Sequence, residues 1–269
     1  MTLSSITVYP IKALDPVHLT HVRITTGGIL EHDRIWALRG RDGRYINGKS
    51  LARIHRLRSR YLLPSTYVTL SFGEEAAEYT YSVEKENEAL AEWLERKLEV
   101  PVEVVTNTDH GFPDDTLASG PTVVSRATLE TVASWFPGLS VIDMHRRFRP
   151  NLVIDGVPPF WEDQLFAASG SVEFKIGDVT LQGINPCARC VVPTRDPVSG
   201  EAQSDFRKKF IERRQATLPP WADRSRFDHF YRLATNTRID PSEAGKVLHV
   251  GDQVRLPAES HASAGTQGS

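Results

Sequence analysis

The stretch INPCARCVVPTRDPVSG, residues 184–200, contains both cysteines of the chain, Cys187 and Cys190. A structural zinc site takes four ligands, and this pair supplies only half of one. A thioredoxin-like dithiol places its first cysteine at a helix N-terminus, whereas Pro193 makes the segment after Cys190 read as extended. The stretch therefore favours neither a zinc site nor a redox dithiol.

Two interpretations of the thiols remain open. Free cysteine most often behaves as a small buried hydrophobic residue, and Cys187 fits that description. Cys190 differs because Arg189 precedes it, and a neighbouring cation favours the thiolate form. A thiolate is a natural ligand for a soft or high-valent metal centre.

Composition limits the class of protein. The 269 residues contain only two cysteines and carry a formal net charge of -2. This composition argues against a disulfide framework, and no secretion signal or membrane-length apolar run is visible. We therefore expect a cytoplasmic protein that binds neither nucleic acid nor membrane, since a nucleic-acid-binding domain usually has a clustered basic face. Any anionic ligand must be met by local arginines and lysines.

Short strand-like runs separated by turns dominate the sequence, and helical periodicity is rare. Because the strands do not alternate with long helices, β-barrels with helical excursions fit better than a βαβ array. We predict a mainly β fold with a few helices: an N-terminal β-barrel domain over 1–115, a second β-barrel domain over 116–256 and a disordered tail over 257–269. Turn-forming residues at 107–121 mark the boundary.

Particular elements follow from local patterns. Residues 87–98 repeat apolar side chains at helical spacing, and residues 125–136 read as a helix that Ser125 caps. A basic helix is expected around 204–215. Hairpins are expected at the Asp-Gly of 41–46 and at the Gly-Asp turn within 172–184.

Taken in order, several motifs resemble one known family. These are VYPIKALDPV (8–17), GGILEHDRIWALRGRDGRYING (27–48), VVSRATLE (123–130), RFRPNLVIDG (147–156), FWEDQL (160–165), FKIGDVTL (174–181) and AGKVLHVGDQV (244–254). Together with PCARCVVPTRDP they resemble the molybdenum cofactor sulfurase C-terminal (MOSC) domain family with its N-terminal β-barrel domain. Within that family the chain is similar to the amidoxime-reducing proteins of mitochondria and their bacterial counterparts.

The resemblance implies a molybdenum cofactor, a molybdenum held by a molybdopterin dithiolene, with Cys190 as the protein's sulfur ligand to the metal. No pyridoxal phosphate domain is expected in this chain, and two cysteines leave none for an iron–sulfur cluster. The residues that match cofactor contacts in the family are Lys12, Arg34, Arg149 and Arg189 among the basic residues, and Ser125 and Asn151 among the polar ones.

Each of these residues has a plainer interpretation. Arg34 could pair with Asp33 or Glu31 on a hairpin surface, and the arginines of 146–149 could form a solvated charged run. Glu162 and Asp163 could cap or brace their own segment. The family pattern also differs here at three positions, where Ala13 and Ala188 replace hydroxyl residues and Pro193 replaces a threonine.

The function implied by the resemblance is reduction of small N-hydroxylated substrates. Electrons would come from a separate donor protein, ferredoxin-like or cytochrome-like. The alternative is a carrier that transfers molybdenum cofactor or sulfur, and a third possibility is a binding domain that has lost the cofactor. The basic segment 207–214 is expected either to dock an acidic donor or to be a solvated helix face.

Overall fold

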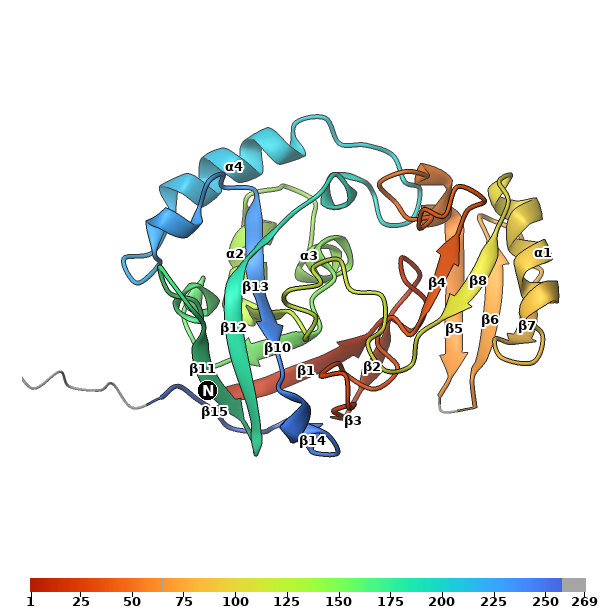
Figure 1. The fold of residues 1–269 in the computed structure, drawn as a ribbon. Helices are drawn as coiled ribbons and strands as arrows, with labels where there is room; N and C mark the ends of the chain where they lie inside the picture. The colour runs from red at the N-terminus through yellow and green to blue at the C-terminus, as the bar shows by residue number, and fades with distance from the viewer. Residues whose placement is uncertain (64, 258–269) are drawn as a thin grey trace, which may run out of the picture.

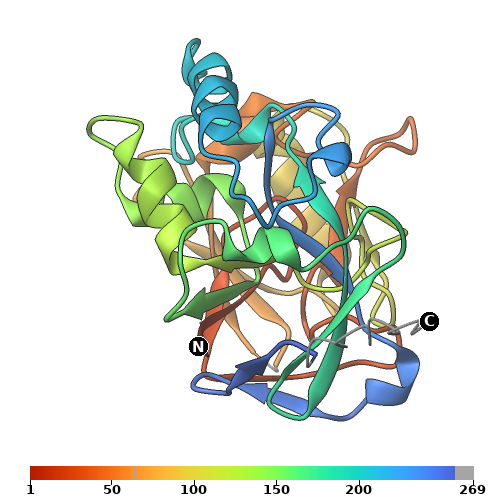
Figure 2. The same cartoon turned by 90° about the vertical axis from the view of Figure 1, so that its left-hand side faces the viewer.

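An eight-stranded sheet forms the larger part of the computed structural model, which describes residues 1–63 and 65–257 (Figure 1). The sheet curls into a half barrel, as the turned view in Figure 2 shows. Its strand order is β15-β11-β12-β13-β9-β10-β1-β2. The bounds are β1 Thr2–Val8, β2 Val17–Leu19, β9 Val123–Ser125, β10 Leu152–Asp155, β11 Val172–Ile176, β12 Val179–Ala188, β13 Arg232–Arg238 and β15 Val254–Arg255.

The curl brings the C-terminal end of the sheet back to β1. The backbone N–H of Leu3 donates to the carbonyl of Asp252 at 2.9 Å, and the N–H of Gly251 donates to the carbonyl of Leu3 at 2.8 Å. Apolar side chains of the strands fill the concave side, among them Leu3, Phe174 and Leu181, all at most 1% exposed. The predicted mainly β fold is confirmed.

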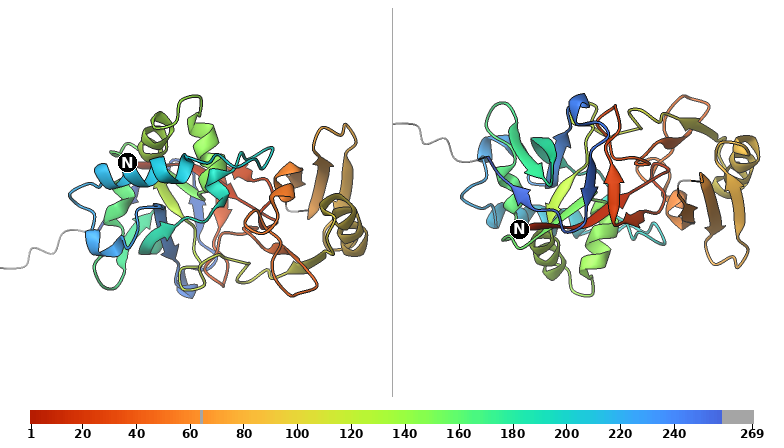
Figure 3. Two further views of the ribbon diagram at one scale, coloured as in Figure 1. Left: turned by 90° about the horizontal axis from the view of Figure 1, so that it is seen from above. Right: turned by 90° about the horizontal axis from the view of Figure 1, so that it is seen from below.

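Smaller sheets make up the other end of the molecule (Figure 3). Apolar residues of these strands and of the helix beside them share one core, in which Trp36, Leu70 and Trp93 are buried. The helix has the predicted bounds. The elements are the pair β4 Trp36–Arg39 with β8 Glu103–Thr106, the sheet β5 Leu57–Leu62, β6 Tyr67–Phe72 and β7 Tyr79–Ser82, and the helix α1 Asn87–Leu98. A further pair, β3 His21–Arg23 with β14 Val247–His249, belongs with the large sheet instead, since its Val22 and Leu248 lie in the core of that sheet.

Both predicted hairpin turns are present. Ile176 and Val179 close the β11–β12 hairpin, and Gly177 takes a positive φ of 57° that suits glycine. At 41–46 the N–H of Gly40 donates to the carbonyl of Arg44, and Arg39 forms a bridge with Tyr45. The second turn is therefore a tight loop at the end of β4.

Helices α2 and α3 pack against each other beside the sheet, with α4 above them (Figure 2). Ser125 caps α2 as predicted, since its hydroxyl accepts from the N–H of Thr128. No helix within the described ranges is long and apolar enough to cross a membrane. The helices are α2 Arg126–Ser134, α3 Val141–Phe148 and α4 Phe206–Ala216, and the 3-10 segments are η1 Ala52–Arg56, η2 Trp161–Gln164, η3 Val192–Thr194, η4 Arg224–Arg226 and η5 Pro241–Glu243.

The division of the chain near residue 115 stays a prediction. Strand pairing crosses this position, because β1 lies between β2 and β10 in the large sheet. The predicted disordered tail, 257–269, lies outside the described residues from 258 onward.

Candidate functional site

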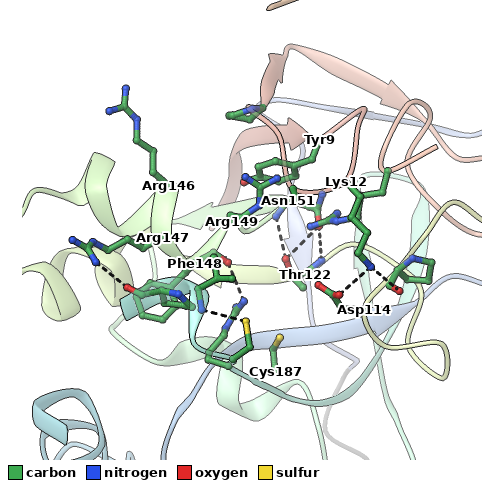
Figure 4. A pocket seen from close by; sticks show the side chains of 18 of the residues that line it. Tyr9, Lys12, Asp114, Thr122, Arg146, Arg147, Phe148, Arg149, Asn151 and Cys187 are labelled. Carbon is green, nitrogen blue, oxygen red and sulfur yellow. Dashed lines mark hydrogen bonds and ion pairs between the residues drawn. The ribbon is translucent and has the colours of Figure 1, made fainter. Parts of the chain in front are cut away.

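A cavity of about 1260 Å³ lies where the large sheet meets the smaller ones (Figure 4). Its walls come from the first strands, the loop over 110–120, helix α3 and the turn after β12. Segments far apart in the sequence therefore share one space. Of the predicted site residues, the cavity brings together Lys12, Arg34, Arg149, Asn151, Arg189 and Cys190.

Both thiols line this cavity, and both are half-buried. The backbone N–H of Val192 donates to the Sγ of Cys190 at 3.4 Å. Burial raises the pKa of the Cys187 thiol, which keeps that group protonated. The two thiols therefore differ in their contacts, because the Sγ of Cys190 accepts from a backbone N–H, whereas the Sγ of Cys187 donates to the carbonyl of Ala188 at 3.9 Å.

The segment after Cys190 is not extended, so that expectation was wrong. Residues Val192–Thr194 form the 3-10 segment η3, in which the N–H of Thr194 donates to the carbonyl of Val191 at 3.0 Å. Pro193 fits this short helix because its fixed φ is helical and its missing N–H is not needed there. The turn leaves Cys190 directly at the end of β12.

Tyr9 is the platform on which two of the predicted arginines stack. The guanidinium carbons of Arg34 and Arg149 lie 4.9 and 4.0 Å from the centroid of the Tyr9 ring. Both arginines have positive φ, 55° and 51°, and Arg149 is the C-cap of α3. Burial raises the pKa of Tyr9 to about 12, so the ring stays neutral. Sequence reasoning missed Tyr9, although it lies within the opening motif.

The plainer interpretation of Arg34 is correct about its pairing with an acid and wrong about its exposure on a hairpin surface. Arg34 forms an ion pair with Asp33, but the buried Asp33 and the half-buried Arg34 lie in the cavity wall rather than on an exposed surface. The Nη1 group of Arg34 also donates to the Oδ1 of Asn151 at 3.3 Å. Arg149 donates to the carbonyl of Leu14 at 2.7 Å. Both guanidinium groups are thus fixed before any ligand binds.

Residues 146–149 are not a uniformly solvated run. Arg146 is exposed, which fits that interpretation. Arg147 is buried and donates to the carbonyls of Pro193 and Arg195 at 2.9 and 2.8 Å, so it fixes η3 against α3. Arg149, two positions later, faces Tyr9 in the cavity. Only one of these three arginines therefore behaves as a surface charge.

Asn151 is 1% exposed and acts as a junction between strands. Its Nδ2 donates to the carbonyl of Thr7 at 3.0 Å, and its Oδ1 accepts from the N–H of Thr122 at 3.2 Å. The same oxygen accepts from Arg34. Asn151 therefore positions Arg34, and Thr122 is a second cavity residue that sequence reasoning missed.

Arg189 and Lys12 connect different segments of the cavity wall through hydrogen bonds to backbone carbonyls. Arg189 donates to the carbonyl of Leu233 from Nε and Nη2, at 3.0 and 2.6 Å, and to that of Phe148 from Nη1 at 2.9 Å. These bonds fasten the cysteine turn to β13 and α3. The Nζ of Lys12 donates to the carbonyl of Phe112 at 2.9 Å and pairs with Asp114 at 3.0 Å. Burial lowers the pKa of Lys12, and Asp114 opposes that effect.

The cavity is strongly cationic on a chain of net charge -2. Burial lowers the pKa values of His55 and His145 to about 4, so neither adds charge at neutral pH. Four aspartates face twelve lysines and arginines, which makes the cavity attractive to anions. The cationic residues are Lys12, Arg34, Lys49, Arg58, Arg126, Arg146, Arg147, Arg149, Arg189, Arg195, Arg226 and Arg232, and the aspartates are Asp15, Asp33, Asp114 and Asp115.

Ser125 is the one predicted site residue that does not line the cavity. It is fully buried, and its hydroxyl accepts from the N–H of Thr128 at 3.0 Å. Its own N–H donates to the Oε2 of Glu162 at 3.2 Å. Ser125 thus belongs with Glu162 and Asp163, whose contacts match the bracing interpretation. Ala13 and Ala188, where the family has hydroxyl residues, both line the cavity.

This mostly β chain therefore has a cavity that combines many cationic side chains with thiols. Such a combination suits anionic ligands and metals that prefer sulfur. Comparison with family models is more specific. The MOSC N-terminal beta barrel domain matches residues 1–137, and the MOSC domain matches residues 118–255. The chain therefore belongs to the MOSC domain family.

Two curated relatives are distant. A molybdenum cofactor sulfurase of Solanum lycopersicum is 25% identical over 310 aligned positions, which cover 96% of this chain and 36% of the relative. The mitochondrial amidoxime-reducing component 1 of Homo sapiens is 25% identical over 236 positions, covering 74% of this chain and 67% of the relative. The chain thus spans about a third of the sulfurase and two thirds of the amidoxime-reducing component.

Proposed function

We propose that this protein binds a molybdenum cofactor in the cationic cavity and reduces small N-hydroxylated compounds with electrons from a separate protein. The observation that carries the proposal is the convergence of Cys190 with the stacked Arg34 and Arg149 on one cavity. Membership of the MOSC family and the similarity to an amidoxime-reducing component support it.

The residues present fit such a cofactor. Its phosphate and pterin oxygens need several donors, and arginine offers a planar fork that matches them. Arg149 and Arg189 have no carboxylate partner within the described residues, so their charges are available to an anion. A half-buried thiol in the same wall supplies a soft ligand. The cavity, at about 1260 Å³, also leaves room for a small substrate beside the cofactor.

The chain's own residues would divide the work. Cys190 would ligate the metal, while Arg34, Arg149 and Arg189 would hold the anionic part of the cofactor, with Lys12 at the opposite wall. Asn151 would keep Arg34 in place through its Oδ1. Cys187 would stay a neutral thiol beside the ligand, because burial raises its pKa.

When bound, the cofactor supplies the two-electron chemistry that breaks the N–O bond of the substrate. Two electrons and two protons convert the N-hydroxyl compound to its amine or amidine and one molecule of water. The protein contributes the ligand, the access and the electrostatics of the cavity. The two cysteines of this chain cannot ligate an iron–sulfur cluster, and in our proposal a separate ferredoxin-like or cytochrome-like donor would supply the electrons.

A second candidate is a carrier that delivers cofactor or sulfur to another enzyme. The similarity to a molybdenum cofactor sulfurase along 96% of this chain favours it. In that role Cys190 would carry a sulfur atom or hold the cofactor until its transfer. The same cavity residues would serve both functions, so only a turnover experiment separates them.

Turnover with an artificial reductant tests the proposal. Metal-loaded protein should reduce benzamidoxime with reduced methyl viologen but not with NADH alone, because viologen reaches the metal without a partner protein. The Cys190→Ser variant should be inactive. Loaded protein that is inert toward a panel of N-hydroxylated compounds, yet transfers its cofactor to an apo-enzyme, would establish the carrier instead.

A further inference from the structure

Helix α4 carries four basic side chains around its solvent-facing surface. Arg207, Lys208 and Arg213 are exposed, and Lys209 is half-buried beside the Phe136 ring. Within the described part of the chain, the helix forms one ion pair, between the buried Arg214 and Asp163. The only acid in the helix is Glu212. We call Arg207, Lys208, Lys209 and Arg213 the α4 face.

The other side of α4 is part of the interior. Phe206 and Phe210 are fully buried against Phe148, and the Phe210 ring meets the Tyr231 ring edge-on at 5.3 Å. This aromatic core fixes the helix in one position on the sheet, so its exposed charges form a stable surface rather than a mobile one.

A short path connects the α4 face with the cysteine turn. The guanidinium carbon of Arg207 lies 5.4 Å from the centroid of the Tyr231 ring. The carbonyl of Tyr231 accepts from the N–H of Arg189 at 2.9 Å, and Arg189 is bonded to Cys190. One ring, one hydrogen bond and one residue therefore separate the surface of α4 from the proposed metal ligand.

The α4 face is also separate from the cavity mouth. None of the α4 residues that the structure describes lines the cavity. A protein bound on α4 would therefore leave the cavity open to a small substrate.

We propose that the α4 face is the docking surface for an acidic one-electron carrier protein, which delivers electrons to the Cys190 end of the cavity. The inference rests on the proposed function. Two molecules of reduced carrier each give up one electron for every N–O bond broken, and two protons from solvent complete the amine and the water. Positive charge on α4 matches an acidic carrier and accelerates its association.

Charge reversal on α4 tests this surface. An acidic plant-type [2Fe–2S] ferredoxin, kept reduced by NADPH and ferredoxin reductase, would be the donor. The double variant Lys208→Glu/Arg213→Glu should raise the KM for ferredoxin by about tenfold or more, because like charges then face each other. The kcat with reduced viologen should not change, since neither side chain touches the cavity.

A matched control makes the same change of charge elsewhere. Lys85→Glu/Arg96→Glu alters two exposed cations on and beside α1, at the other end of the molecule (Figures 1 and 3). This variant should keep the KM of the parent. Equal KM values for both double variants, or equal increases in both, would overturn the assignment and leave α4 as a solvated helix face.

A binding measurement separates this inference from the proposed function. Calorimetric titration with oxidised ferredoxin should give a Kd that weakens with salt in the parent and weakens strongly in the α4 variant. If viologen-driven turnover fails but this binding pattern holds, the reductase proposal falls while the docking surface stands. Binding that is identical in the parent and the α4 variant would remove the docking surface.

Discussion

Two clusters of polar and charged side chains, one half-buried around the cavity and one fully buried, behave differently. The cavity cluster contains Arg34, Arg149, Arg189 and Cys190 beside open space. The interior cluster, behind the sheet, contains no residue that lines the cavity and consists of Ser125, Thr128, Glu162, Asp163 and Arg214.

The interior cluster pairs its one cation with a carboxylate, although the Oε1 of Glu162 and the Nη1 of Arg214 have no hydrogen-bond partner among the described residues. Arg214 pairs with Asp163, and Glu162 accepts from the hydroxyl of Thr128 at 3.0 Å. In the cavity cluster, Arg34 pairs with Asp33, but Arg149 and Arg189 donate to backbone carbonyls, so their positive charge is not cancelled. Buried charge that is neutralised within the protein braces the fold, whereas half-buried cations without a carboxylate partner beside a cavity indicate a site for an anion.

The effect of Arg149→Ala on cofactor binding should separate the two clusters. Loss of a charge-assisted contact of about 1.5–3 kcal/mol corresponds to cofactor binding weakened by roughly tenfold to a hundredfold. Arg149→Lys should restore part of it, because lysine keeps the charge but lacks the planar fork. Molybdenum per chain after dialysis measures the loss.

The control for that experiment is Arg60→Ala, which removes an exposed arginine paired with Glu78. A surface pair of this kind contributes little. If Arg149→Ala retains as much molybdenum as Arg60→Ala, the anion site lies elsewhere.

The next effect concerns the interior cluster and depends on pH. Burial, with the nearby charge of Asp163, raises the pKa of Glu162 to about 7. The folded state therefore holds an extra proton between the ordinary carboxyl value and about 7, and stability falls as pH rises through that window. Glu162→Gln has no such penalty, so its advantage should grow with pH and level off above 7, reaching on the order of 3 kcal/mol.

Urea unfolding of the parent and Glu162→Gln at pH 5 and pH 8 measures this difference. Molybdenum content should be the same in both proteins, because Glu162 does not line the cavity. A difference in stability that is constant with pH would mean that the carboxyl is already ionised in the folded protein.

The smallest effect should come from Ser125→Ala. Removing a helix N-cap costs about 1 kcal/mol, and Ser125 caps α2. Its position predicts a lower Tm with unchanged molybdenum content. A lower molybdenum content without a lower Tm would instead mean that Ser125 contacts the cofactor, as the family resemblance implies.

Local patterns predicted the local structure well. Helix α1 has the predicted bounds because its apolar spacing is regular, and the Gly-Asp turn closes β11 and β12. The wrong prediction of extended backbone after Cys190 has a local cause too. Pro193 is compatible with both extended and 3-10 backbone, and the choice depends on Arg147, which binds the carbonyl of Pro193 from another element.

The site itself came from the ordered motifs rather than from any single pattern. Cys190, Arg34 and Arg149 lie far apart in the sequence, and no periodicity brings them together. Tyr9 and Thr122 were missed because their roles depend on partners from distant strands, as when Asn151 accepts from the N–H of Thr122. Such contacts become visible only in the folded chain.

The most direct test of the central claim is the molybdenum content of Cys190→Ser and Cys187→Ser, expressed in a host that makes the cofactor. A hydroxyl is a poorer ligand than a thiolate for a soft metal centre. We expect Cys190→Ser to lose its molybdenum and Cys187→Ser to keep most of it. The circular dichroism spectra of the two variants should be equal, which shows that both are folded. Equal loss in the two variants, or a parent protein that binds no molybdenum, would contradict this expectation.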